Sequence, residues 1–80
     1  MKSIQISLQT ALQVKKFVNM VQHYPFTINL RSDRYVVDAK SVLGIFSLDL
    51  SRPVNVEIHT SDEEQEVCNQ LIESLKEFTI

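Results

Sequence analysis

Few side chains in this sequence have the chemistry and spacing that catalysis or metal binding needs. The candidates are the two histidines, His23 and His59, and the one cysteine, Cys68. They lie too far apart in the sequence to suggest a zinc site, whose ligands come in closely spaced pairs. Cys68 falls in an apolar helical stripe, which indicates a buried structural thiol rather than a nucleophile. We therefore expect no catalytic residue and no zinc ion.

The acidic residues near the C-terminus do not suggest a metal site either. Those between Asp62 and Glu66 lack the spacing of a calcium loop, and they follow Ser61 at the expected start of a helix. Because Gly44 is the only glycine, the chain also lacks a glycine-rich loop that could hold phosphates. The sequence thus predicts neither a metal ion nor a cofactor.

Length and composition indicate one small domain that spans residues 1–80. The sequence is 44% hydrophobic with one glycine and two prolines, so no segment has the composition of a linker. A domain of this size has little room for a deep substrate cavity beside its core, and we expect a protein that is not an enzyme. A net charge of −2 and dispersed basic residues argue against nucleic-acid binding.

Cysteine usage and hydropathy indicate the compartment. A lone cysteine cannot form an internal disulfide, and no apolar run of signal-peptide length follows Met1 and Lys2. The longest apolar stretches have only a few residues, far short of the ~20 that cross a bilayer. The sequence predicts a cytoplasmic protein without membrane insertion.

Hydrophobic periodicity predicts the elements that must position any functional side chain. Apolar and polar residues alternate in four segments, as in half-buried strands, over residues 3–8, 26–31, 35–39 and 54–59. Helical spacing predicts helices over residues 10–23 and 61–78 and a short one over 41–48. Pro25 ends the first helix, Ser41 is placed as an N-cap, and Ser61 with Glu64 suggests a capping box.

The resulting order, β-α-β-β-α-β-α, predicts an α+β fold. The polar residues 32–34 suggest a hairpin between the second and third strands. Half-polar strands indicate an antiparallel sheet with one wet face, and amphipathic helices must cover the other face. We expect a two-layer open-faced sandwich, with a four-stranded antiparallel sheet and three helices on one face.

The segment from Lys40 to Leu48 reads KSVLGIFSL. It resembles the segment K-S-hydrophobic-hydrophobic-G-hydrophobic-hydrophobic-S-L of the HPr family, the phosphocarrier proteins of the bacterial sugar phosphotransferase system. Residues 28–48, the acidic start of the last helix and the order of elements also resemble that family, so the resemblance covers most of the chain. It implies a single HPr-like domain with the same open-faced fold.

The phosphate-carrying motif of that family is missing. Family members use a histidine in a G-hydrophobic-H-x-R-P motif, where helix N-terminal amides and the arginine stabilise the phosphoryl group. Counting back from Phe17 and Val18 places Thr10 at the histidine position and Leu12 at the arginine position. A shift of three residues would place Gln13 at the histidine position but would misalign the helix. Superposing the first strand also requires a shortened loop, so we expect no histidine phosphocarrier activity.

Ser41 is the candidate site of regulation. In some family members the serine of the K-S segment is phosphorylated by a dedicated kinase, and the resemblance places Ser41 there. A phosphate at this position would lie at a helix N-terminus, where backbone amides favour its negative charge. The alternative interpretation is an ordinary N-cap serine.

The short helix also carries a candidate interface. It contains more apolar residues than two helical turns can bury, and some of them resemble an apolar patch that docks enzymes and regulators in the family. A basic rim on the first helix would replace the missing arginine. The interface candidates are Lys40, Val42, Leu43, Phe46, Lys15 and Lys16. The alternatives are that the apolar residues belong to the core and that the lysines are merely solvated.

The resemblance therefore implies an HPr-like regulatory or protein-binding module, related to the sugar phosphotransferase system but without histidine chemistry. Its implied partners are proteins, either an HPr-type serine kinase or a transcriptional regulator. One alternative is a phosphocarrier that uses a non-standard acceptor. Another is a structural partner that forms a homodimer through a sheet edge or the helix patch.

Overall fold

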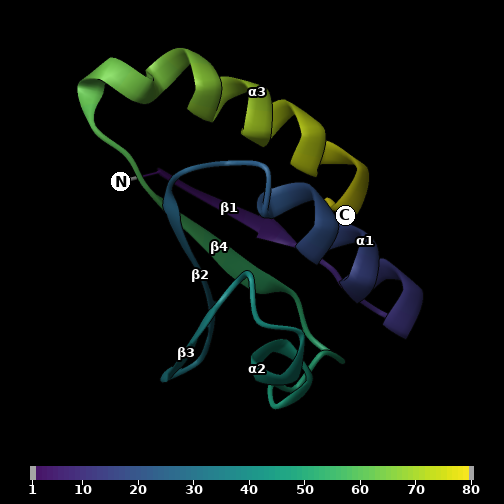
Figure 1. Ribbon diagram of the computed structural model, residues 1–80. Coiled ribbons are helices and arrows are strands. Elements are labelled where there is room, and N and C mark those ends of the chain that lie inside the picture. Colours follow the sequence, from purple (N-terminus) through teal and green to yellow (C-terminus); the bar gives the residue numbers. More distant parts are fainter. Residues whose placement is uncertain (1, 80) are drawn as a thin grey trace.

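The computed structural model describes residues 2–79, which form one sheet and the helices that pack on it (Figure 1). The strands are β1 (Lys2–Ile6), β2 (Thr27–Ser32), β3 (Tyr35–Asp38) and β4 (Val54–His59), and the helices are α1 (Ala11–Val21), α2 (Val42–Phe46) and α3 (Gln65–Leu75). Short 3-10 turns, η1 (Asp62–Glu64) and η2 (Lys76–Phe78), precede and follow α3. The order of strands and helices is the predicted one.

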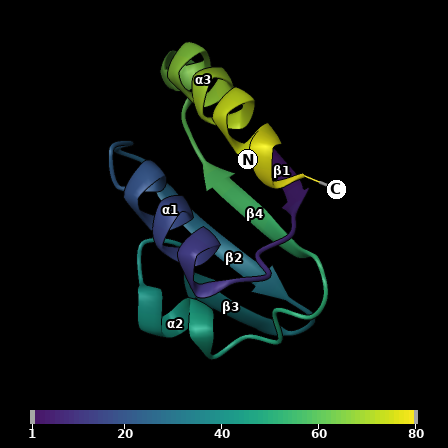
Figure 2. The same cartoon turned by 90° about the vertical axis from the view of Figure 1, so that its right-hand side faces the viewer.

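The sheet has the strand order β1-β4-β2-β3, and every pair of neighbours is antiparallel. Figure 2 shows β1 at one edge and β3 at the other, with the helices packed against the sheet. The hairpin between β2 and β3 turns at Asp33, whose φ of 53° is a left-handed conformation that aspartate tolerates. The predicted α+β open-faced sandwich is confirmed.

Alternation along the strands separates a buried face from a polar face. The inward-facing residues are Ile6, Ile28, Leu30, Val54, Val56 and Ile58, and all are buried. The helices add Val14, Phe17, Val18, Val21, Ile45, Cys68, Leu71 and Leu75 to the same core. The intervening strand residues face solvent, because a two-layer fold leaves one face of its sheet open.

Element ends differ slightly from those predicted. The first strand stops at Ile6, although Leu8 is buried, because the chain must turn into the cap of α1. The C-terminal helix begins with η1, and Glu64 Oε1 accepts from both the backbone N and the Oγ of Ser61 at 3.1 Å. Within residues 2–79, no helix is long and apolar enough to span a membrane.

Candidate functional site

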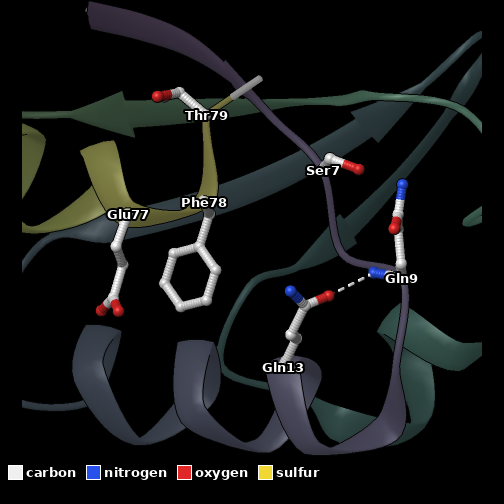
Figure 3. A pocket seen from close by; sticks show the side chains of 6 residues that line it. All are labelled: Ser7, Gln9, Gln13, Glu77, Phe78 and Thr79. Atoms are coloured by element: carbon white, nitrogen blue, oxygen red, sulfur yellow. Dashed lines mark hydrogen bonds between the residues drawn. The ribbon is translucent and has the colours of Figure 1, made fainter.

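The N-terminus of α1 is closed by a reciprocal capping box. Thr10 Oγ1 accepts from the backbone N of Gln13 at 3.1 Å, as an N-cap side chain does. In return, Gln13 Oε1 accepts from the backbone N of Gln9 at 2.7 Å (Figure 3). It also accepts from the backbone N of Thr10 at 3.3 Å. A neutral side chain of the same helix therefore occupies two backbone donors in the loop that precedes α1.

A small polar pocket lies beside this cap, between the loop after β1 and the C-terminal segment. Its volume is about 220 Å³, and it is lined by Ser7, Gln9, Gln13, Glu77, Phe78 and Thr79 (Figure 3). The backbone N of Ser7 donates to the carbonyl of Phe78 at 2.8 Å, which ties the two segments together. The one ionisable side chain among these residues is the acid Glu77, whose charge disfavours an anionic ligand.

The residue at the predicted arginine position cannot replace an arginine. Leu12 lies on the first turn of α1 and is 77% exposed. It brings no positive charge to the helix N-terminus. Lys16, one turn later, forms an ion pair with Glu77 at 2.8 Å, which joins α1 to η2. Lys15 is exposed.

Neither histidine lies at this site. Ile6, which leads into the loop before α1, pairs with Val54 at the start of β4. His59 ends β4, at the opposite end of the sheet, where it pairs with Thr27. His23 follows the C-terminal end of α1, and both histidines are exposed. The described residues hold no cluster of histidine, cysteine and acidic side chains that could bind a metal ion.

Ser41 begins α2 and is its N-cap. Its Oγ accepts from the backbone N of Gly44 at 3.1 Å, and the residue is half-buried. The side chain of the preceding Lys40 reaches the residues that follow α1, and its Nζ donates to the carbonyl of Tyr24 at 2.8 Å. The backbone N of Lys40 donates to Asp38 Oδ1 at 2.9 Å. The amine that we expected at an interface is therefore already bound within the protein.

The apolar residues of α2 divide between core and surface. Ile45 is fully buried, and Val42 packs at the margin of the core. Leu43 is 84% exposed and Phe46 is 46% exposed. We call the exposed side of α2, formed by Val42, Leu43 and Phe46, the α2 patch.

Gly44 lets α2 lie close to β3. A Cβ on Gly44 would stand 3.3 Å from the Cβ of Val37 and 3.2 Å from Ser41 Oγ. Both distances are tighter than most contacts of this kind. The glycine of the K-S segment therefore has a packing role, which fixes the α2 patch against the edge of the sheet.

The charged pair on the open face of the sheet connects β2 and β4. Arg31 Nε donates to Glu57 Oε2 at 2.7 Å. This hydrogen bond lowers the pKa of Glu57 below its ordinary value and raises the pKa of Arg31. This pair is not apparent from the sequence, since only the strand register brings the two residues together.

Sequence reasoning also missed the role of Gln13 and Glu77 in closing the site. The pattern T-x-x-Q over residues 10–13 was a readable signal, because it matches a capping box. No sequence pattern indicates the position of Glu77, because its contact with Lys16 joins residues far apart in the chain.

Comparisons with known proteins identify relatives. The family model described as PTS HPr component phosphorylation site matches residues 4–78. No curated protein matches the sequence. Solved structures that match include HPr-C-His from Thermoanaerobacter tengcongensis, at 26% identity and a TM-score of 0.73, with 95% of this chain and 92% of that chain covered.

Two further structures are similar over nearly the whole chain. The phosphocarrier protein HPr from Bacillus anthracis shares 27% identity at a TM-score of 0.66, covering 99% of this chain and 94% of that one. The Bacillus subtilis catabolite repression protein Crh shares 26% identity at a TM-score of 0.65, covering 96% and 88%. Its crystal structure is described as a dimer with a swapping domain.

Proposed function

The chain belongs to the HPr family, and we propose that it is a regulatory, protein-binding member that does not carry phosphate on a histidine. The observation that carries this proposal is the closed N-terminus of α1. Gln13 Oε1 accepts from the backbone N of Gln9 and of Thr10. The resemblance to the family implies that these groups lie beside the phosphoryl position. A phosphoryl oxygen would have to displace this carboxamide before it could use them.

Three substitutions act together at this position. In the family motif H-x-R-P, Thr10 stands for the histidine, Leu12 for the arginine and Gln13 for the proline. The acceptor nitrogen and the positive charge are thus both lost. Proline has no side-chain acceptor, whereas Gln13 has one and turns it onto the loop amides. Phosphoryl transfer needs donors that are free where negative charge develops, and this arrangement occupies the backbone N of Gln9, Thr10 and Gln13.

The α2 patch supports a protein-binding role. Burying a leucine side chain completely contributes about 1.5–3 kcal/mol, and Leu43 is 84% exposed in the free protein. Phe46 adds a half-exposed aromatic ring on the same short helix. Residues of this kind supply most of the binding energy when a partner excludes water from them. The partners that fit the family are an HPr-type serine kinase and a transcriptional regulator.

Phosphorylation of Ser41 would act on this surface directly. Ser41 lies next to Val42 at the start of α2, and its Oγ already faces the backbone N of Gly44 at 3.1 Å. A phosphate would add a charge of about −2 beside an apolar patch. Such a charge would exclude apolar partners and attract basic ones, so we propose Ser41 as the switch of this module.

Intact-mass spectrometry tests both parts of the proposal. The protein is incubated with phosphoenolpyruvate and the first enzyme of the phosphotransferase system, and separately with ATP and an HPr-type serine kinase. An HPr protein with the histidine motif is the positive control in both mixtures, and Ser41→Ala is the matched variant.

We expect no mass change in the first mixture and one acid-stable phosphate in the second, absent from Ser41→Ala. An acid-labile phosphate in the first mixture would overturn the loss of histidine chemistry and favour a phosphocarrier with a non-standard acceptor. No phosphate in the second would reject the switch and leave a constitutive binding module.

Homodimerisation is a second candidate function, supported by the swapped dimer of the Bacillus subtilis relative. This chain has two sheet edges at which a second copy could add, β1 and β3. The oligomeric state in solution, measured by sedimentation, tests this candidate separately from phosphorylation.

A further inference from the structure

The free edge of β3 presents backbone groups to solvent. The backbone N of Ala39 donates to the carbonyl of Ile28 in β2 at 2.9 Å. Because the direction of backbone groups alternates along an antiparallel strand, those of Tyr35 and Val37 also face β2. The N–H and carbonyl of Val36 and the N–H of Asp38 therefore point away from the sheet.

This edge is short, but it lacks three other features that protect natural edge strands. Natural edge strands are protected by lysine, proline or a bulge. The described strand Tyr35–Asp38 has none of these, and its register with β2 is continuous. Instead it exposes Tyr35 at 67% and Val36 at 43%. The other edge strand, β1, begins with Lys2 and exposes the polar residues Ser3 and Gln5.

The sequence of this edge is complementary to itself. A two-fold axis at Val36 would pair β3 with the β3 strand of a second copy in antiparallel register. In that register Val36 faces the partner's Val36, and Tyr35 faces the partner's Val37. Arg34 falls opposite the partner's Asp38, twice by symmetry. Opposite charges that face each other across strands are stabilising, whereas like charges are destabilising.

We propose that two copies of this chain associate through their β3 edges, centred on Val36, with Arg34 of each copy paired to Asp38 of the other. This inference specifies the homodimer candidate above and does not depend on docking at the α2 patch.

The side-chain directions agree with this register. Val36 pairs with Arg31, and Asp38 pairs with Asn29, so both lie on the open polar face of the sheet. Asp38 uses Oδ1 to accept from the backbone N of Lys40, which leaves Oδ2 for an arginine. The carbonyl of Asp38 is taken by the backbone N of Ser41 at 3.0 Å, so Val36 makes the central reciprocal bonds.

A strand this short buries little surface, and the dimer should be weak and sensitive to salt. Figure 2 shows the β3 edge away from α3 and β1, so a second copy meets no obstacle from them. The contact would join two sheets into one continuous sheet. It would leave β1 with its own β4, in contrast to a strand exchange.

A charge-swap experiment by sedimentation equilibrium tests this register. Wild type, Arg34→Asp and Asp38→Arg are each measured from micromolar to millimolar concentration, followed by an equimolar mixture of the two variants. We expect the apparent mass of the wild type to rise above the monomer mass of 9.2 kDa with concentration. Each variant alone should remain monomeric, because like charges then face each other. The mixture should associate again.

Further variants keep the test decisive. Val36→Lys adds a charge at the axis and should also abolish association, which covers a failure of Asp38→Arg to fold. Ser3→Lys, on the β1 edge, and Leu43→Ser, on α2, should leave it unchanged. A monomeric wild type would overturn both this inference and the homodimer candidate. Association that Ser3→Lys or Leu43→Ser abolishes, or that the charge variants do not change, would overturn the β3 register alone and leave docking untouched.

Discussion

Gln13 Oε1 accepts a hydrogen bond from the backbone N of Gln9 at 2.7 Å, so a side chain of α1 reaches back into the loop that precedes the helix. The proposed loss of the family's chemistry therefore involves more than a missing histidine. The backbone N of Gln9 and that of Thr10 both donate to this neutral acceptor of the same chain. Restoring the acceptor alone should not restore phosphoryl transfer.

We predict that the double variant Thr10→His with Leu12→Arg is phosphorylated poorly by phosphoenolpyruvate and the family's first enzyme. Adding Gln13→Pro to the double variant should accelerate phosphorylation about 100-fold or more, the usual effect of one oxyanion donor. The rate is measured by intact mass over time. A triple variant with Gln13→Ala is the control for the proline ring, and it should also be faster than the double variant. Equal rates in all three would show that the Gln13 cap is irrelevant.

Leu43 provides the test of the α2 patch. Leu43→Ser removes an 84% exposed side chain, so we expect no loss of stability. Its affinity for an HPr-type serine kinase should fall about 10- to 100-fold if Leu43 is an anchor of the interface. Titration calorimetry measures the affinity of wild type and of Leu43→Ser for the kinase. Val67→Ser is the matched control, because Val67 is also an exposed apolar residue, but on α3. An equal effect of the two substitutions would argue against a localised patch.

Lys40 should contribute to stability rather than to binding. Its Nζ donates to the carbonyl of Tyr24 at 2.8 Å in a partly buried position, beyond the C-terminal end of α1. Hydrogen bonds of charged groups contribute about 1.5–3 kcal/mol, so Lys40→Met should lower the free energy of unfolding by about 1–2 kcal/mol. Urea unfolding measures this change. Lys40→Arg keeps a charged donor and should lose less, and a Lys40→Met protein as stable as wild type would contradict the assignment.

The periodic parts of this fold could be predicted from the sequence, because their cause is local. Alternation over β2 and β4 follows from a sheet with one wet face, and the stripe of Val14, Phe17 and Val21 follows from one buried helix face. These patterns depend on residues close together in the chain. They therefore predicted the strands, the helices and the open-faced architecture.

Other contacts around α1 join residues far apart in the chain. Lys40 meets Tyr24, and Lys16 meets Glu77, only after the helices pack. Leu8 shows that the end of a strand is also hard to predict from the sequence. Its alternation predicted a longer first strand, whereas the structure buries it in the loop after Ile6. Burial alone thus does not tell a strand from a loop that packs on the core.

The Arg31–Glu57 pair predicts how acid affects stability. Hydrogen bonding from Arg31 holds the pKa of Glu57 below its ordinary value of 4.5, with a smaller contribution from the charge of His59. A carboxylate with a depressed pKa in the folded state stabilises the fold above its unfolded pKa. That contribution is lost as pH falls through the lower, folded pKa. Stability that depends on the pair should therefore be constant near neutrality and decline below about pH 4.5.

Arg31→Met removes the cause of this shift, so its free energy of unfolding should depend less on pH than that of wild type over the acidic range. Urea unfolding at a series of pH values from 7 downward measures the two slopes. Asp49 supplies a built-in reference, because hydrogen bonds from Ser51 lower its pKa equally in both proteins and leave some acid sensitivity in the variant. The Arg31 side chain of this pair is exposed to solvent. Added salt should therefore screen the pair and reduce the difference in slope between the two proteins. Identical slopes at low salt would mean that the pair seen on the open face does not form in solution.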